Sequence, residues 1–288
     1  MRNAWGGILF VLGGVLFAQP AHAQSDCSNA LGVSRTIEVD TTGGPWFGTP
    51  EGDPNFLAPG EVVLTFDDGP APSSTRAILA ALAAECTKAT FFVVGEMAAA
   101  YPEVVREIDT QGHTIGSHTW SHPNLRRLSD EKMKAQIESA FAAAETGAGH
   151  PIAPFFRYPY LTHTQASIAY LQSRNIAQFA IDIDSFDWRT RNAQRIVRTV
   201  AARLDHHDRG IILLHDIHAS TAAALPSILA LLKTRGFKVV HLKAKAPVET
   251  IAVAQAPPSS SEQRYVVPSR RRVVHAKPWS LGWKWPTW

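Results

Sequence analysis

Short apolar runs alternate with longer amphipathic segments through the middle of the chain. Residues 62–66 are almost wholly apolar, as in a buried strand, whereas residues 129–146 repeat apolar positions at helical spacing. Such alternation is typical of parallel βαβ units, and about seven units predict a compact (β/α) barrel, TIM-like, rather than an open sheet. The pattern predicts further strands at 89–94, 113–116, 154–157, 177–183, 211–214 and 237–242, and further helices at 74–85, 102–110, 164–174, 192–204 and 222–234.

Serines stand where two of these helices are expected to begin. Ser73 or Ser74 is a candidate N-cap for the helix at 74–85, and Ser129 is one for the helix at 129–146. A serine hydroxyl there accepts a hydrogen bond from an otherwise unpaired N–H group of the first turn.

The first 23 residues have the pattern of an export signal. Arg2 supplies the positive start, residues 5–18 form an apolar run shorter than a typical membrane span, and Ala21-His22-Ala23 is a small-x-small cleavage site. We therefore predict a signal peptide at 1–23 and an exported protein, periplasmic or secreted. An uncleaved membrane anchor is the alternative. No later segment predicts a membrane span.

Residues 24–59 are predicted to form an N-terminal arm. The arm holds one strand-like run at 35–39, followed by turns rich in Gly and Pro. The two cysteines of the chain are Cys27, in this arm, and Cys86, in the predicted domain. In an oxidising compartment they can pair and tie the arm to the domain; two unpaired thiols are the alternative.

The composition changes at the C-terminal end. Residues 246–288 contain a Pro257-Pro258 pair followed by serines, the run Arg270-Arg271-Arg272 and four tryptophans, without helical or strand periodicity. We predict a disordered or peripherally docked tail, with a glycan- or lipid-binding segment as the functional alternative. The tail carries six basic and two acidic residues, and the rest of the chain 22 basic and 23 acidic. The near-neutral remainder argues against a nucleic-acid-binding surface.

Titratable residues follow five of the predicted strands. In a parallel barrel the carboxyl ends of the strands meet at one mouth, so these residues are expected to converge. Each cluster alone has an ordinary structural explanation, such as a polar turn, a surface pair or a helix cap, but their joint placement favours an active site. The clusters are Asp67-Asp68-Gly69-Pro70, His118-Thr119-Trp120-Ser121-His122, Arg157-Tyr158-Pro159-Tyr160, Asp184-Ser185-Phe186-Asp187-Trp188 and His215-Asp216.

One carboxylate and two imidazoles form a three-ligand site with open positions, as expected of a catalytic rather than a structural zinc. Asp68, His118 and His122 have this composition. Asp67 beside them is a candidate base for water at such a metal. Zinc is the default ion for these donors, and cobalt, nickel or manganese can bind the same ligands.

Three further residues are candidates for proton transfer. His215 is a candidate acid that protonates a leaving group. Asp187 is expected to hold that imidazole in its charged form, and Arg157 to keep the candidate base ionised and oriented.

Together these clusters resemble the five motifs of the polysaccharide deacetylases, the NodB-homology domains of carbohydrate esterase family 4. The motifs occur in family order over about residues 60–242. The resemblance implies a single catalytic NodB-homology domain at 60–245, folded as a distorted (β/α) barrel, that hydrolyses acetyl groups on glycans with one divalent metal ion. The matching segments are Thr65-Phe66-Asp67-Asp68-Gly69, His118-x3-His122, Arg157-x-Pro159-Tyr160, Asp184-x-x-Asp187-Trp188 and Leu213-x-His215.

The resemblance also implies a role for each matching residue. The implied metal ligands are Asp68, His118 and His122. The implied catalytic residues are Asp67 as base, Arg157 as its partner, His215 as acid, Asp187 as the carboxylate that tunes the acid, and Tyr160, whose backbone N–H helps to bind the oxyanion. The implied substrate-binding residues are Trp188, Leu213 and Pro159. The third motif departs from the family where Tyr158 replaces a common second proline and Leu161-Thr162-His163 replaces a common glycine, which affects the subsite near Tyr160.

The implied activity is removal of N-acetyl groups from N-acetylglucosamine units of an acetylated glycan, with release of acetate. Peptidoglycan, chitooligosaccharides and poly-N-acetylglucosamine are the candidate substrates. An O-acetyl xylan esterase of the same family is one alternative, because esters are cleaved more easily than amides. A non-catalytic glycan-binding protein and a metal carrier are two others, and the complete set of ligands, base and acid argues against both. The sequence leaves the polymer, the native metal and the oligomeric state open.

Overall fold

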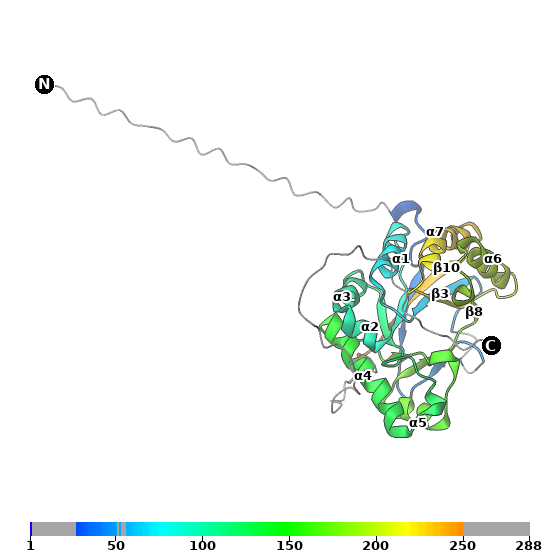
Figure 1. The fold of residues 1–288 in the computed structure, drawn as a ribbon. Helices are drawn as coiled ribbons and strands as arrows, with labels where there is room; N and C mark the ends of the chain where they lie inside the picture. The colour runs from blue at the N-terminus through cyan, green and yellow to red at the C-terminus, as the bar shows by residue number, and fades with distance from the viewer. Residues whose placement is uncertain (2–26, 51, 53–55, 250–288) are drawn as a thin grey trace, which may run out of the picture. The chain divides into compact units, whose positions relative to one another are not determined.

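The computed structural model describes residues 1, 27–50, 52 and 56–249, and Figure 1 shows their path. The signal peptide predicted at 1–23 and residues 250–288 of the predicted tail lie outside these residues. The described chain has ten strands and seven α-helices, and from β3 onward strands and helices mostly alternate. Every strand pairing is parallel, so the predicted parallel α/β fold is confirmed.

The strands follow one another in the order β8, β9, β3, β4, β5, β6, β7 and β2. β10 pairs with the start of β3 and carries β1 on its other side. No pairing among the described residues joins β2 to β8, so hydrogen bonds do not close the barrel there. The strands are β1 (Arg35–Val39), β2 (Trp46–Phe47), β3 (Glu61–Asp67), β4 (Thr90–Val93), β5 (Thr114–Ser117), β6 (Phe155–Phe156), β7 (Ala177–Phe179), β8 (Ile183–Asp184), β9 (Gly210–His215) and β10 (Lys238–Ala244).

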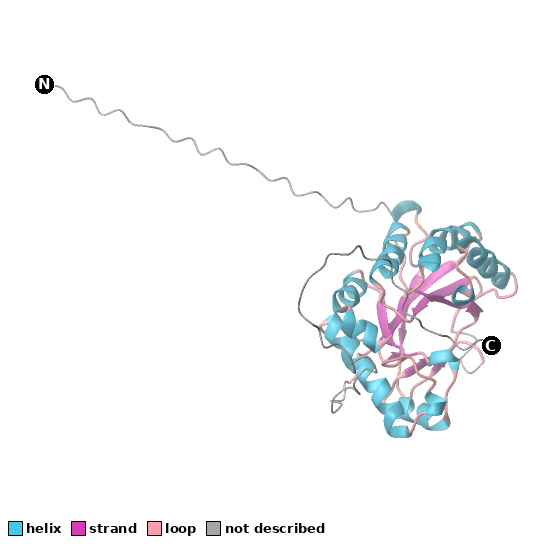
Figure 2. Cartoon of the chain, viewed as in Figure 1, coloured by secondary structure: helices cyan, strands magenta, loops and turns pink. Residues whose placement is uncertain are grey.

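The helices lie outside the strands, as Figure 2 shows. α1 packs on α7, α3 on α4, and α6 on α7. The α-helices are α1 (Pro72–Ala84), α2 (Gly95–Ala100), α3 (Pro102–Thr110), α4 (Asp130–Ala148), α5 (Gln165–Ser173), α6 (Ala193–Leu204) and α7 (Ala219–Thr234). Short 3-10 helices follow some of the strands, namely η2 (Leu125–Arg127), η3 (Pro159–Leu161) and η4 (Asp187–Arg189), and η1 (Cys27–Asn29) opens the described arm.

Side chains alternate between the two faces of β3, and this alternation decides which of them face the barrel interior. Val62, Leu64 and Phe66 belong to the larger core, which includes apolar residues of α1 and α7. Val63 belongs to the second core, which holds Phe92, Phe155, Phe179 and Ile211. Since side chains alternate between the faces of a strand, Asp67 points to the same side as Val63. The same argument places His215 on the side of Ile211 in β9.

Several predicted elements differ from the observed ones. The strand predicted at 177–183 is split into β7 and β8, because the carbonyl of Ala180 accepts a hydrogen bond from Arg157 and the Asp182 carboxylate accepts one from the Ile211 N–H. The serine N-cap predicted for the helix at 74–85 is wrong. α1 begins at Pro72 after Ala71, and proline at the first position supplies the required φ. The Ser129 cap of α4 is confirmed. The elements α2 and β2 were not predicted.

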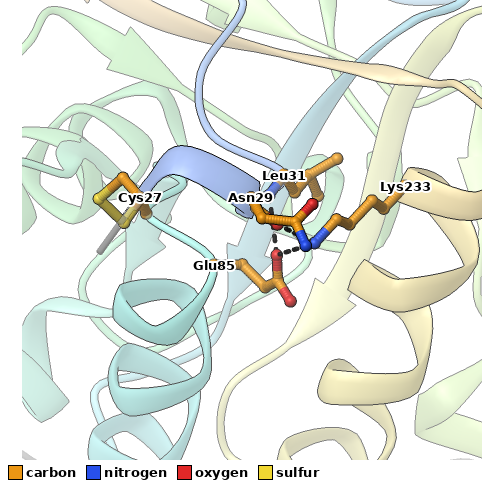
Figure 3. Close-up of a disulfide and its surroundings, with 6 residues drawn as sticks. Cys27, Asn29, Leu31, Glu85 and Lys233 are labelled. Carbon is orange, nitrogen blue, oxygen red and sulfur yellow. Dashed lines mark hydrogen bonds and ion pairs between the residues drawn. A yellow bond between two sulfur atoms is a disulfide. The ribbon is translucent and has the colours of Figure 1, made fainter. Parts of the chain in front are cut away.

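The N-terminal arm is joined to the domain at several points. A disulfide links Cys27 to Cys86 across 59 residues, so of the two alternatives the structure shows the paired one (Figure 3). Next to it, the Glu85 carboxylate accepts a hydrogen bond from the Leu31 N–H at 2.8 Å and lies 3.7 Å from the Lys233 ammonium group. β1 then pairs with β10, and β2 with β7.

The first residues of the predicted tail lie against the domain. Val248 is buried, and its N–H donates to the Ile152 carbonyl at 3.0 Å. The part of the chain that the structure describes contains no helix with the length and apolar character needed to cross a bilayer.

Candidate active site

Left-handed turns aim the side chains at the carboxyl ends of the strands. Asp68 has a φ of 77°, so the chain turns directly after β3 and the two consecutive aspartates can face one place. Thr119, His122, Tyr160 and Phe186 also have φ values between 51° and 67°. Such strained conformations gather where a site requires them.

The structure brings Asp68, His118 and His122 together. Asp68 Oδ1 lies 3.5 Å from His118 Nε2 and 3.4 Å from His122 Nε2. His118 Nδ1 lies 2.7 Å from the Arg157 carbonyl, which requires the proton on Nδ1 and leaves the Nε2 lone pair directed at the cluster. One ligand atom from each residue lies within 4.8 Å of the others.

This donor set fits a divalent cation. Asp68 Oδ1 is buried and has no hydrogen-bond partner among the described residues. A buried carboxylate oxygen without a partner is costly, and a cation between it and the two imidazoles removes that cost. Burial lowers the pKa of His118 to about 3, so the imidazole is neutral and can act as a ligand.

Asp67 stands beside the cluster with its two oxygens in different surroundings. Arg157 donates to Asp67 Oδ1 at 2.7 Å and to the Thr65 hydroxyl at 2.8 Å. Asp67 Oδ2 lies 3.8 Å from His118 Nε2, on the side of the cluster. Burial raises the pKa of Asp67 to about 6, and the positive charge of Arg157 limits that rise. A carboxylate with such a pKa can exchange a proton near neutral pH.

Arg157 is itself fully buried and fixed on several sides. It donates to the Ala180 carbonyl at 3.2 Å, and its guanidinium carbon lies 4.3 Å from the centre of the Phe92 ring. These contacts hold the guanidinium group in one position, so it orients the Asp67 carboxylate.

His215 and Asp187 form the other side of the site. Asp187 Oδ1 lies 2.7 Å from His215 Nδ1, and Asp187 Oδ2 accepts the His215 N–H at 2.7 Å and the Thr221 hydroxyl at 2.7 Å. Burial disfavours the charged imidazole, but the Asp187 carboxylate outweighs it, and the pKa of His215 rises to about 10. The protonated ring can therefore donate a proton from Nε2.

The remaining predicted residues are two partly exposed aromatic residues and two buried apolar ones. The Tyr160 side chain is 42% exposed, and its ring packs edge-on against His122 at 4.7 Å between centroids. Trp188 is 38% exposed and lies under the guanidinium group of Arg189. Pro159 is buried and precedes Tyr160 in the sequence. Leu213 is buried in β9, where Asp184 of β8 is its register partner.

Asp216 and His218 lie near the site and had no predicted role. Asp216 is buried. Its Oδ2 accepts the Thr75 hydroxyl at 2.6 Å, its N–H donates to the Asp67 carbonyl at 3.2 Å, and burial raises its pKa to about 7. Its side chain fills the space beside Gly69, where a Cβ atom would lie 2.0 Å from Asp216 Oδ2. His218 lies 6.0 Å from His215 between ring centroids, and burial lowers its pKa to about 4. Both residues follow His215 by at most three positions, and this closeness in the sequence could have identified them as neighbours of the site.

Comparison with known proteins gives consistent matches. Residues 57–179 match the family model described as polysaccharide deacetylase. The peptidoglycan-N-acetylglucosamine deacetylase PgdA of Listeria monocytogenes is 36% identical over 181 residues, which are 63% of this chain and 38% of PgdA. The chain therefore matches well under half of the length of that relative.

Two other relatives are matched over more of their length. The chitooligosaccharide deacetylase of Azorhizobium caulinodans is 34% identical over 196 residues, covering 63% of this chain and 92% of that protein. The solved structure of the Bdellovibrio bacteriovorus peptidoglycan deacetylase Bd3279 superposes with a TM-score of 0.69 at 34% identity, covering 76% of this chain and 62% of that one.

Proposed function

Because this chain belongs to the polysaccharide deacetylase family, we propose that it removes N-acetyl groups from N-acetylglucosamine units of a glycan and releases acetate. One observation carries the proposal. The buried, unpartnered oxygen of Asp68 faces two imidazoles, with a candidate base on one side and a protonated histidine on the other. Metal binding alone requires neither the base nor the acid.

The metal ligands in this proposal are Asp68, His118 and His122, and zinc is the proposed ion because carboxylate and neutral imidazole donors with open positions suit it. A divalent ion held there polarises a carbonyl group and lowers the pKa of a water molecule.

The side chains around these ligands handle the protons. Asp67 takes a proton from the attacking water, while Arg157 keeps that carboxylate in place. The backbone N–H of Tyr160 donates to the oxygen that becomes negative, and one such donor is worth roughly 3 kcal/mol in a preorganised site. His215 then protonates the nitrogen that leaves, because an amine departs poorly as an anion. Trp188, Leu213 and Pro159 bind the acetylated sugar.

Peptidoglycan is the proposed polymer, because two of the three relatives described above are named as peptidoglycan deacetylases. We also propose that residues 1–23 are a signal peptide and that the protein is exported. The disulfide between Cys27 and Cys86 supports this, since such bonds persist in oxidising compartments. The boundaries 60–245 for the catalytic domain and 246–288 for the tail are part of the same proposal.

Acetate release from N-acetylglucosamine oligomers tests the function. The purified protein should release acetate, and a chelator should abolish release until zinc is added back. His122→Ala should lose both bound metal and activity, whereas His150→Ala, at an exposed histidine of the surface, should keep both. His215→Ala should keep the metal and lose at least about two orders of magnitude in turnover.

The same assay separates the alternatives. Release from acetylated xylan but not from N-acetylglucosamine oligomers would make the protein an esterase. Tight binding of oligomers without any release would make it a glycan-binding protein, and metal binding without either would make it a carrier.

A further inference from the structure

Arginines gather along one side of the domain next to the candidate active site. Between residues 189 and 203 the chain has five arginines and no acidic residue. A groove of about 660 Å³ runs along α6, and neither Asp nor Glu lines it. Its lining comprises Phe186, Arg195, Arg198, Thr199, Ala202, Arg203 and His206.

The groove reaches the turn that follows β8, at a carboxyl end of the parallel strands. Phe186 lines it and lies 6.1 Å from Trp188 between ring centroids. The guanidinium carbons of Arg189 and Arg203 lie 5.3 and 5.2 Å from the centre of the Phe186 ring, so this ring connects the mouth to the arginines of α6. From Arg195 to Arg203 the helix extends the positive surface by about 12 Å.

These arginines lack the partners that other arginines of the protein have. Arg76, Arg174 and Arg235 pair with carboxylates at 2.8 to 3.1 Å. Over the described ranges, no ion pair joins Arg189, Arg191, Arg195, Arg198 or Arg203 to an acidic side chain.

The arrangement is unfavourable for the helix alone. Arg195 and Arg198 are three positions apart on one face of α6, and like charges at that spacing destabilise a helix. Guanidinium groups bind carboxylates with two parallel hydrogen bonds, and an anionic ligand relieves the repulsion between them.

We propose that this groove binds the carboxylates of an anionic glycan whose acetylated sugar lies at the mouth. The inference rests on the proposed deacetylase function and refines its substrate: a strand that carries carboxylates along its length is preferred over a neutral one. The sugar ring itself is recognised at the mouth, and the charge is recognised at α6.

The test compares substrates that differ only in charge. Peptide-free glycan strands of alternating N-acetylglucosamine and N-acetylmuramic acid carry a carboxylate on every second sugar. The same strands with the carboxylates converted to amides are the neutral control. For the wild-type protein, kcat/KM should be higher on the charged strands, through a lower KM.

Charge reversal at the groove gives the decisive variant. In Arg195→Glu/Arg198→Glu the ratio of kcat/KM on charged to amidated strands should fall roughly tenfold or more. Glutamate near the first turn of a helix is compatible with folding. Arg106→Glu, at an exposed arginine of α3, is the matched control and should keep the wild-type ratio. Equilibrium binding of the charged strands to the chelator-treated protein should weaken in the same variant.

The outcomes separate this inference from the proposed function. Acetate release from both strands with a ratio that charge reversal leaves unchanged would overturn the groove and leave the deacetylase intact. No acetate from any strand would overturn the function instead. If the protein binds strands that carry peptides but not the peptide-free charged strands, the recognised carboxylates lie on the peptide. That result would also overturn the proposal.

Discussion

The two oxygens of the Asp187 carboxylate fix both the position and the charge of His215. One faces the imidazole Nδ1, and the other accepts the backbone N–H of the same residue and the Thr221 hydroxyl. The ring is thereby oriented with Nε2 toward the site. Since the carboxylate stabilises the imidazolium, it raises the pKa of His215 to about 10 and keeps the proton in place at neutral pH.

Asp187→Asn should move the pH dependence of activity. Without the negative charge the pKa of His215 falls, so the protonated acid is lost at a lower pH and the alkaline limb of the kcat/KM profile shifts to lower pH. Activity at pH 9 should fall further than activity at pH 7. Thr221→Val, which removes one hydrogen bond to the Asp187 carboxylate and leaves its charge in place, should shift the limb less. An alkaline limb at the wild-type position in Asp187→Asn would contradict the role given to this pair.

The turn after β3 depends on the absence of a side chain at Gly69. A Cβ atom there would lie 2.0 Å from Asp216 Oδ2, and the Thr75 hydroxyl holds that oxygen in place. Gly69→Ala should therefore lower the free energy of unfolding by about 2 kcal/mol, as overpacking does. In the Asp216→Ala background the same substitution should cost less than half as much, because the clash is gone. Denaturant unfolding of the wild type, the two single variants and the double variant measures these free energies. An equal cost of Gly69→Ala in both backgrounds would refute the clash.

For single residues, the sequence identified the candidate ligands, base and acid, but not the backbone geometry that brings them together. The ligand, base and acid candidates follow strands, so their side of the barrel was predictable. The positive φ values of Asp68 and His122 were not, because these residue types usually adopt other conformations. Asp216 received no role because its packing against Gly69 is a contact across 147 residues of sequence.

Among the elements, β5 is preceded by a histidine whose packing requires the neutral form. His113 Nδ1 accepts the Ala89 N–H at 3.2 Å, and the ring packs edge-on against Phe91. Burial, with the nearby positive charge of Lys88, lowers the pKa of His113 to about 3. Protonation of Nδ1 would remove the hydrogen bond between the starts of β4 and β5.

The free energy of unfolding should therefore fall as the pH drops below about 6.5, the pKa of an unperturbed histidine. In that range the unfolded chain binds a proton that the folded protein excludes, and the loss reaches about 2 kcal/mol near pH 5. His113→Asn offers an acceptor oxygen that does not titrate, so its unfolding free energy should depend less on pH between 7 and 5. His150→Asn, at a surface histidine with a raised pKa, should not flatten the dependence. Parallel pH curves for the wild type and His113→Asn would exclude this role.

The sequence predicted the longer elements and missed the short or interrupted ones. The apolar pattern fixed β3, β9, α4 and α6 to within a few residues. The strand at 177–183 looked continuous, yet the carbonyl of Ala180 and the carboxylate of Asp182 bond outside a strand ladder. β2 has two residues among turns, and its pairing with β7 is a contact that no local pattern reveals.

For the whole molecule, the path of the arm determines which distant parts meet. β1 lies beside β10 at the other end of the described chain, and Arg35 forms two hydrogen bonds of 2.7 Å with Glu61. This path brings Cys27 to Cys86, which directly follows Glu85, the C-cap residue of α1. Two cysteines alone could not reveal it, since pairing depends on where the arm runs.

The disulfide should contribute a large share of the stability and little to catalysis. Closing a loop of 59 residues lowers the entropy of the unfolded chain, which is worth about 4 kcal/mol in the chain-entropy model. Cys27→Ser/Cys86→Ser should lower the free energy of unfolding by about that amount in denaturant titrations.

Cys86 follows the C-terminal end of α1, whereas the candidate active site lies where β3 ends and α1 begins. Acetate release by the double variant, measured well below its unfolding temperature, should therefore match the wild type. A reductant should destabilise the wild type and leave the double variant unchanged. Equal stability of the two proteins would mean that the bond does not constrain the arm, and the β1–β10 pairing alone would then hold it.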